Sequence, residues 1–322
     1  MSNLPIISNC TADTIRAAAL ALKAGHLVAF PTETVYGLGA DARNPKAVKR
    51  IYEVKGRPID HPLIVHISSI DQIEKWATGI PDYAISLANK FWPGPMTLIL
   101  NRTKFVEDFV SGGQDTVGLR IPSDPIALAL IGEFEKISNS AIAAPSANRF
   151  GQVSPTSSAD VLEELGEFLT NTDLILNGGN SIIGIESTII DCSGAHPRIL
   201  RSGFITKEAI ESELGMAMVS QLHQNMVKFS GSFETHYAPS CKVFLGEIPI
   251  AGAGFLALSE VETPTGMVRL AQPKSLEEFA HILYATFRAA DHNGLRILVV
   301  SPPRGGGIAE AIRERLTKAS TN

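Results

Sequence analysis

The chain has 322 residues, of which 44% are hydrophobic and 19% are charged, with a formal net charge of −5. The length indicates two domains. The composition excludes a largely disordered chain and a membrane-spanning protein. The negative charge disfavours a general nucleic-acid binder, which is usually basic, so any binding of anions would use a local patch. The first residues lack the basic and apolar regions of a signal peptide, so we expect a cytoplasmic protein without membrane contact. The three cysteines, Cys10, Cys192 and Cys241, are too few and too scattered for a disulfide framework or a zinc site.

The N-terminal two thirds alternate helix-like and strand-like segments, which predicts an α/β fold. Asn44 and Pro45 are typical of a helix start, and Gly56 is typical of a helix end. Helices are expected over residues 11–23, 44–56, 82–91, 126–131 and 156–168. Strands are expected over residues 27–30, 62–67, 97–100, 116–121, 141–144, 173–176, 187–191 and 198–200.

The pattern changes after about residue 207. Residues 221–240 are polar, show no sustained period and end near a proline, which indicates a linker. An α/β pattern then restarts, with strands over residues 242–245, 254–258 and 295–300 and helices over residues 276–287 and 308–318. We therefore predict a first domain over residues 1–207, a linker over 208–240 and a second domain over 241–322.

The common phosphate-binding motifs are absent or weak. The chain has no GxxxxGK[ST] sequence. Residues 37–42 fit GxGxxG/A formally but do not join a strand directly to a helix. Residues 305–307 are three glycines between a strand and a helix, for which a tight turn is the favoured interpretation.

A basic segment covers residues 43–57, where six Lys or Arg residues accompany one acid, Glu53. Lys55 and Arg57 flank Gly56, at the point where the helix is expected to end. A lysine there could complement the helix dipole, but two cations on one turn are also suited to clamping phosphate groups. We favour a phosphate-binding turn.

Polar side chains also share one face of the strand over residues 116–121. Thr116, Gly118 and Arg120 alternate with apolar residues. An arginine inside an apolar strand either pairs with an acid or meets an anionic ligand in a cavity. The segments PSAN (145–148) and SPT (154–156) could present N–H groups to anions or simply cap helices. His66, in another apolar strand, is more often a core residue than a catalyst in such a place.

Several segments, taken in order, resemble the YrdC-like family. They are FPTETVYGLG (30–39), KGRP with PLIVH (55–66), WPGPMT (92–97), TVGLRIP (116–122), APSAN with SPT (144–156), and ESTIID with RILRSG (186–203). Residues 236–239 (HYAP) and 305–316 (GGGIAEAIRERL) resemble the extra Rossmann-like domain of the family's long form. The resemblance implies a twisted mixed-sheet catalytic domain with a large open cleft, followed by a smaller Rossmann-like α/β domain.

The resemblance also implies an activity, L-threonylcarbamoyladenylate synthesis by a nucleotidyltransferase. L-threonine, bicarbonate and ATP would give threonylcarbamoyl-AMP and pyrophosphate, for modification of the adenosine next to the tRNA anticodon. Mg²⁺ would accompany ATP, with no residue assigned to the metal itself. The implied partners are the downstream tRNA threonylcarbamoyl-transfer machinery and a weak tRNA contact.

Site residues follow from the same resemblance. Lys55 and Arg57 match catalytic positions. Threonine-binding positions are matched by Thr34, His66, Arg120, Ala144 and Ser187. ATP-binding positions are matched by Arg57, His61, Thr116, Ser146, Asn148, Ser154, Arg201 and Tyr237. At His61 the family usually has Asn, which offers a donor and an acceptor on a more compact group than the imidazole ring.

The chemistry requires concentrated positive charge, because all three substrates carry anionic groups. Lys55, Arg57, Arg120 and Arg201 would supply it together with Mg²⁺. No general base stands out, so we expect catalysis by positioning and charge neutralisation, with His66 or the substrates themselves as candidate bases. We expect the linker to cross the cleft and cover ATP, and the second domain to anchor it without supplying a catalytic residue.

Two other functions fit parts of this pattern. The first is a double-stranded RNA or tRNA binding module that uses the basic turn, without ATP turnover and with steep salt dependence. The second is a carbamoyl-group enzyme of the same fold with another acceptor. The long form with its linker favours the synthase.

Overall fold

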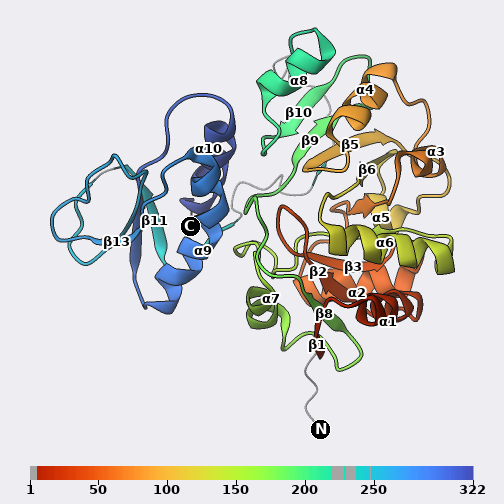
Figure 1. Cartoon of the computed structure of the whole chain (residues 1–322), viewed down its shortest axis with the longest axis horizontal. Coiled ribbons are helices and arrows are strands. Elements are labelled where there is room, and N and C mark those ends of the chain that lie inside the picture. Colours follow the sequence, from red (N-terminus) through yellow and green to blue (C-terminus); the bar gives the residue numbers. More distant parts are fainter. Residues whose placement is uncertain (1–5, 219–227, 230–236, 247, 322) are drawn as a thin grey trace.

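The structure is a computed structural model that describes residues 6–218, 228–229, 237–246 and 248–321. Within these residues, ten strands form one mixed sheet in the order β1-β8-β2-β3-β7-β4-β6-β5-β9-β10. Their bounds are β1 (Ile6–Asn9), β2 (Val28–Phe30), β3 (Gly37–Asp41), β4 (Ile64–His66), β5 (Met96–Asn101), β6 (Thr116–Arg120), β7 (Ile142–Ala143), β8 (Leu174–Asn177), β9 (Thr188–Asp191) and β10 (Arg198–Arg201). This confirms the expected mixed-sheet α/β class (Figure 1).

The helices of this part begin and end at the signals in the sequence. Thr11 caps the first helix in a capping box, Asn44 caps the second, and Gly56 ends it in the left-handed conformation. The helices are α1 (Ala12–Lys23), α2 (Pro45–Lys55), α3 (Ile73–Trp76), α4 (Asp82–Phe91), α5 (Asp108–Ser111), α6 (Pro125–Ser138), α7 (Ser158–Leu165) and α8 (Lys207–Leu214), with a 3-10 turn over Ile70–Gln72. Helix α6 extends seven residues beyond its predicted end, until Asn139 adopts the left-handed conformation (φ 50°).

Strand β3 stands where the sequence formally fits GxGxxG/A. It pairs antiparallel with β2 and β7, so the segment is part of the sheet and forms no phosphate loop. A Cβ on Gly39 would lie 2.8 Å from Ile142 Cγ2 and 2.9 Å from Phe30 Cε1, so close packing accounts for this glycine.

The C-terminal part contains a second, parallel sheet in the order β11-β14-β12-β13. Its elements are β11 (Lys242–Leu245), β12 (Gly254–Leu256), β13 (Val268–Ala271), α9 (Leu276–His292), β14 (Ile297–Val300) and α10 (Ile308–Ala319). Helices α9 and α10 lie on the side of this sheet that faces the large sheet (Figure 1). Their apolar faces share one core with Val35, Val153, Ile183 and Ile185, so the two parts of the chain are packed together.

The predicted linker begins with a helix. Ile210 of α8 is buried in the main core, and Ser86 Oγ of α4 donates to Glu213 Oε1 over 2.8 Å. Much of the remaining segment, including residues 230–232 and His236, lies outside the described residues. Its described pieces, Lys228–Phe229 and Tyr237–Ser240, both contact the N-terminal part.

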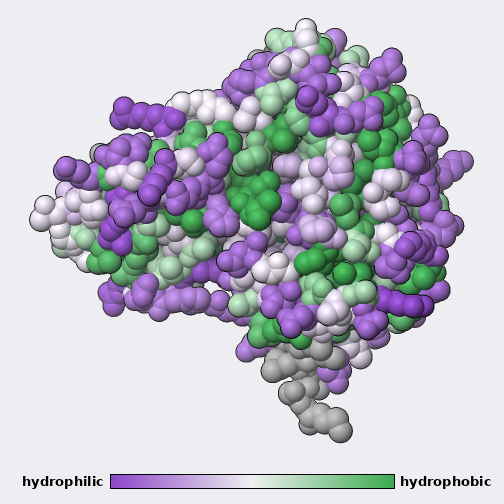
Figure 2. All heavy atoms as spheres, in the orientation of Figure 1, coloured by the Kyte–Doolittle hydropathy of each residue, from purple (hydrophilic) through white to green (hydrophobic). Residues whose placement is uncertain are grey.

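On the face drawn in Figure 2, hydrophobic residues lie where the two parts of the chain meet and also in separate patches on each part, among polar residues. Among the helices that the structure describes, none combines the length and the apolar character needed to cross a bilayer.

Candidate active site

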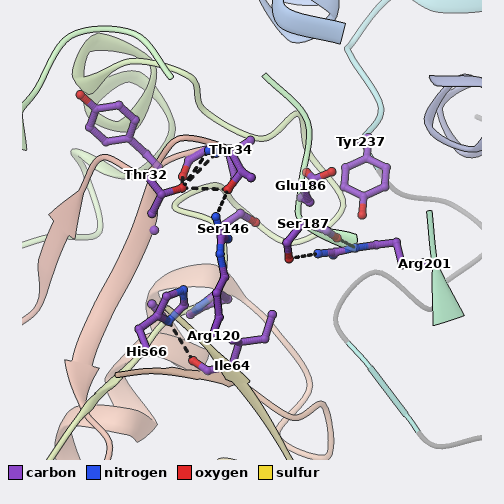
Figure 3. Close-up of a pocket in the computed structure, with 15 residues that line it drawn as sticks. Thr32, Thr34, Ile64, His66, Arg120, Ser146, Glu186, Ser187, Arg201 and Tyr237 are labelled. Carbon is purple, nitrogen blue, oxygen red and sulfur yellow. Dashed lines mark hydrogen bonds between the residues drawn. The ribbon is translucent and has the colours of Figure 1, made fainter. Parts of the chain in front are cut away.

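A pocket of about 480 Å³ opens beside the centre of the large sheet (Figure 3). It is lined by Thr32, Thr34, Val35, Tyr36, Gly37, Ile64, His66, Arg120, Ala144, Pro145, Ser146, Glu186, Ser187, Arg201 and Tyr237. All five predicted threonine-binding residues therefore line one pocket, together with Ser146, Arg201 and Tyr237 from the predicted ATP-binding set.

Sheet register brings these residues together. Strands β4 and β6 pair in parallel with His66 opposite Arg120, and β7 pairs with β4 on the other side. Ala144 follows β7 directly, and Ser187 precedes β9. The pocket consequently has two walls, with Thr34, His66 and Arg120 on one and Glu186, Ser187, Arg201 and Tyr237 on the other (Figure 3).

The sequence left open whether Arg120 pairs with an acid or faces a ligand cavity, and in the structure it does both. Its side chain lines the pocket, but Nη2 lies 2.8 Å from Oε1 of the buried Glu33 and donates to Thr34 Oγ1 over 2.9 Å. A buried arginine–carboxylate pair largely cancels the positive charge that was expected here. The ion pair favours a structural role for Arg120, and its contact with a substrate carboxylate stays a prediction.

His66 is a buried residue that nevertheless reaches the pocket. Its Nδ1 lies 3.2 Å from the Ile64 carbonyl oxygen, and its ring meets the edge of Phe30 at a centroid distance of 6.0 Å. Burial and the neighbouring Arg120 lower the pKa of His66 to about 3. A histidine with so low a pKa is a poor base towards an ammonium group, so the candidate base of the sequence analysis is not supported.

Arg201 is held rigidly at the opposite wall. It donates from Nε to the Ser187 carbonyl over 3.0 Å and from Nη2 to Ser187 Oγ over 3.1 Å. Ser187 Oγ in turn lies 2.8 Å from Thr97 Oγ1. These contacts fix the guanidinium and the serine hydroxyl as one unit, which is the preorganisation that anion binding requires.

Lys55 differs from the predicted phosphate clamp. It is 2% exposed, is absent from the pocket lining, and donates from Nζ to the Ser146 carbonyl over 2.6 Å and to the Asn148 carbonyl. Burial and the nearby Arg57 lower the pKa of Lys55 well below its ordinary value. Lys55 therefore holds the segment that carries Ser146, and its predicted contact with phosphate groups stays a prediction.

Arg57 is also buried outside the pocket lining, with 6% exposure. Its Nη2 donates to the Pro62 carbonyl over 3.0 Å, and its buried Nε has no hydrogen-bond partner among the described residues. Burial lowers the pKa of Arg57 to about 10, which still leaves it charged at neutral pH. Because Lys55 and Arg57 are both buried, the turn does not present them to RNA as an exposed patch.

The remaining predicted ATP-binding residues lie outside the lining. Asn148 donates to the Arg149 and Gln152 carbonyls, each over 2.8 Å, and Ser154 donates to Glu186 Oε1 over 2.6 Å. His61 is buried against Phe150, and burial and Arg57 lower its pKa. Thr116 lines a neighbouring pocket that Lys228 and Phe229 of the predicted linker also line.

The linker residues are anchored there by several contacts. Lys228 N donates to Gln114 Oε1 over 2.7 Å, and Gln114 Nε2 donates back to the Lys228 carbonyl over 3.0 Å. The Lys228 ammonium lies 2.5 Å from Asp60 Oδ2, and Phe229 packs against Ile99 and Ile189. The described part of the linker thus reaches both the pocket, through Tyr237, and its neighbour.

Two acids were given no role by the sequence analysis. Glu33 pairs with Arg120, and Glu186 forms part of the opposite wall. Both stand inside the quoted motifs and beside apolar runs, where a carboxylate is costly to bury without a partner. The cost of burying a carboxylate was the signal in the sequence that could have identified both acids. A buried carboxylate needs a cation or several hydrogen-bond donors nearby, and such groups gather at functional sites.

The chain is similar to known proteins over both of its parts. A family model for Sua5, YciO and YrdC proteins, described as telomere recombination, matches residues 20–203, and one for a threonylcarbamoyl-AMP synthase C-terminal domain matches residues 205–321. A threonylcarbamoyl-AMP synthase of Pyrococcus abyssi is 38% identical over 95% of this chain and 94% of its own length. One of Bacillus subtilis is 39% identical over 95% and 92%. The crystal structure of P. abyssi Sua5 complexed with L-threonine has a TM-score of 0.87 and 36% identity, and covers 100% of this chain and 98% of that one.

Proposed function

The chain belongs to the Sua5/YciO/YrdC family in its long, two-domain form, and on that premise we propose that the pocket at the sheet centre unites L-threonine, bicarbonate and ATP. The activity of the chain is threonylcarbamoyl-AMP synthesis, a nucleotidyl transfer in the service of tRNA modification. The observation that carries the site is that one pocket gathers Thr34, His66, Ser187 and Arg201 from distant parts of the sequence.

Each wall of the pocket would bind a different substrate. Threonine would lie against the wall of Thr34, His66 and Arg120, with its amine near neutral groups. ATP would lie towards Ser146, Arg201 and Tyr237, and a contact of its phosphates with Arg57, which is buried outside the lining, stays a prediction. The threonine amine adds to the carbon of bicarbonate with loss of water. A carbamate oxygen then attacks the α-phosphorus, and the bond to pyrophosphate breaks.

Among the described residues that line the pocket, the titratable groups are poorly suited to act as a general acid or base in these steps. His66 has a pKa of about 3, and Glu33 is paired with Arg120. Glu186 accepts hydrogen bonds from Ser154 and Tyr284 and pairs with Arg315. We infer that the pocket acts mainly by positioning the reactants and by neutralising the charge that develops on the phosphates.

Mg²⁺ would enter with ATP. The buried Oδ1 of Asn148 has no hydrogen-bond partner among the described residues, and an amide oxygen is a ligand type that a hard cation accepts. Asn148 would hold the ion together with the ATP phosphates. When bound, Mg²⁺ would supply neutralisation of phosphate charge. The cytoplasm, where ATP and tRNA are present, would be the place of action, and the partners would be the tRNA threonylcarbamoyl-transfer machinery and, through a weak contact, tRNA.

A direct assay tests the proposed function. The full chain is incubated with ATP, Mg²⁺, bicarbonate and each amino acid in turn, and products are identified by mass spectrometry. Threonylcarbamoyl-AMP and pyrophosphate should form with L-threonine. Product with a different acceptor would favour another carbamoyl-group enzyme. RNA binding with steep salt dependence and no ATP turnover would instead favour a binding module.

Changing Arg120 to lysine should raise the threonine KM by at least ~10-fold, because a planar fork that can hold a carboxylate becomes a point charge. Steady-state kinetics at saturating ATP measure this. The matched control is Arg50→Lys, which breaks a bidentate pair with Asp173 away from the pocket and should leave the threonine KM unchanged. An unchanged threonine KM in Arg120→Lys would leave Arg120 with its structural role alone.

The neutral state of His66 predicts a pH dependence of stability. Its pKa is about 3 in the folded chain, whereas an unfolded histidine titrates near 6.5. The unfolded state then binds more protons between these values, so the free energy of unfolding should fall as the pH drops below about 6.5, by up to about 1.4 kcal/mol per pH unit. Urea unfolding from about pH 7 to about pH 4.5 measures the slope.

His66→Asn should remove this part of the slope, because asparagine does not titrate. His196→Asn, at an exposed position, should keep it. Equal slopes for wild type and His66→Asn would show that His66 does not stay neutral in the folded chain.

A further inference from the structure

Glu186 connects the pocket to the C-terminal helices. Its Oε1 accepts from Ser154 Oγ over 2.6 Å, and its Oε2 accepts from Tyr284 Oη of α9 over 2.9 Å and from Arg315 Nε of α10 over 3.1 Å. The two C-terminal side chains, Tyr284 and Arg315, have no exposed surface. A residue of the pocket wall is thus held by both long helices of the second part.

The same two helices hold Tyr237. The rings of Tyr237 and Tyr284 stack at a centroid distance of 5.8 Å and an interplanar angle of 26°. The Arg315 guanidinium carbon lies 5.5 Å from the centroid of the Tyr237 ring, within the range of a cation–π contact. We call Ser154, Glu186, Tyr237, Tyr284 and Arg315 the interdomain cluster.

Charge makes the cluster relevant to an anionic ligand. Burial would raise the pKa of Glu186, but Arg315, Arg201 and the Ser154 hydroxyl lower it to about 2, so Glu186 is a carboxylate at neutral pH. An uncompensated carboxylate at this wall would repel phosphate groups. Arg315 compensates it from the side away from the pocket, because Glu186 and Tyr237 line the pocket whereas Arg315 does not.

We propose that Tyr284 and Arg315 are positioning residues for nucleotide binding. They fix Glu186 and Tyr237 at one wall of the pocket, so that the C-terminal part sets the affinity for ATP. Thr34, His66 and Arg120 of the predicted threonine site lie on the opposite wall, and Ser187 alone of the threonine residues placed on a wall adjoins Glu186. We therefore expect threonine affinity to change much less than ATP affinity. The inference rests on the proposed function only in taking the ligand of this wall to be ATP.

The test uses the full chain and isothermal titration calorimetry with ATP and with threonine separately, so no turnover is needed. Tyr284→Phe removes one hydroxyl and keeps the ring that stacks on Tyr237. Loss of a hydrogen bond to a charged group should weaken ATP binding by about five- to tenfold and change threonine binding by less than about twofold. Combined with Glu186→Gln, the effect of Tyr284→Phe should shrink, because the two changes act through one contact.

Arg315→Met removes the positive charge that pairs with Glu186. On its own it leaves a buried carboxylate without its partner, which could impair folding. The double variant Glu186→Gln with Arg315→Met removes both charges and so avoids this problem. The double variant should lose less ATP affinity than Arg315→Met alone. Glu164→Gln is the matched control. It weakens another contact between the two parts, to Arg288 over 3.0 Å, at a residue outside the pocket lining. It should lower the melting temperature and leave ATP affinity unchanged.

Three results would overturn the inference. The first is that Tyr284→Phe binds ATP as tightly as wild type does. The second is that Tyr284→Phe weakens the binding of ATP and of threonine equally. The third is that Glu164→Gln weakens ATP binding as much as Tyr284→Phe does. Wild type that does not bind ATP would overturn it too. Wild type that binds ATP but forms no threonylcarbamoyl-AMP would refute the proposed function, and the calorimetric comparison would then still support or overturn the role of the cluster.

Discussion

Replacing Lys55 with methionine should reduce turnover by at least ~10²-fold. The Lys55 ammonium holds the carbonyls of Ser146 and Asn148, and methionine fills similar space without a donor. The segment that carries Ser146 into the pocket would lose its anchor, and two carbonyls would be left without their donor. Since Lys55 is buried, we also expect a loss of about 2–4 kcal/mol in the free energy of unfolding.

The kinetic effect must be separated from the stability effect. Turnover is therefore measured well below the melting temperature, and urea unfolding of the same sample gives the folded fraction. Lys49→Met on the same helix is the matched control, because this side chain is 75% exposed and only pairs with Glu53. It should retain activity within about twofold, as expected for an exposed ion pair. Near-normal turnover in folded Lys55→Met would remove Lys55 from the catalytic machinery.

Local signals made much of the fold predictable. Helices α1, α2 and α4 begin and end within about a residue of the expected positions, because caps, prolines and glycines act over a few neighbours. Strand β3 was missed for a physical reason. Gly39 is required by the closeness of Phe30 and Ile142, and with a second glycine at Gly37 the strand lacks the side-chain alternation by which strands are recognised.

The sequence predicted many of the residues at the site, but it did not predict which side chains contact one another there. The motifs led to eight residues that line the pocket, whereas six other predicted site residues lie outside its lining. Pairing of Arg120 with Glu33 depends on how distant strands meet, which spacing along one strand does not reveal. Lys55 was predicted to clamp phosphate groups from the end of its helix, whereas in the structure its side chain is buried and its ammonium contacts main-chain carbonyls.

Removal of the C-terminal part should nearly abolish ATP turnover, by at least ~10²-fold. The sequence predicts that the first domain ends at residue 207, but a cut there would delete α8, whose Ile210 belongs to the main core. A cut after residue 216 keeps the helix and its contact with α4. Residues 1–216 should therefore fold, as circular dichroism and thermal melting would show.

The loss of turnover follows from what the cut removes. Glu186 would lose Tyr284 and Arg315 and would keep Ser154 as a donor, so an under-compensated carboxylate would face the phosphates. The pocket would also lose Tyr237, and Val35 and Ile185 would lose their apolar cover. Tyr237→Ala in the full chain should cause part of this loss, about tenfold in the ATP KM, and Tyr237→Phe should cause less because it keeps the stacked ring. Full synthase activity in folded 1–216 would refute both the predicted lid and any role of the second domain at the pocket.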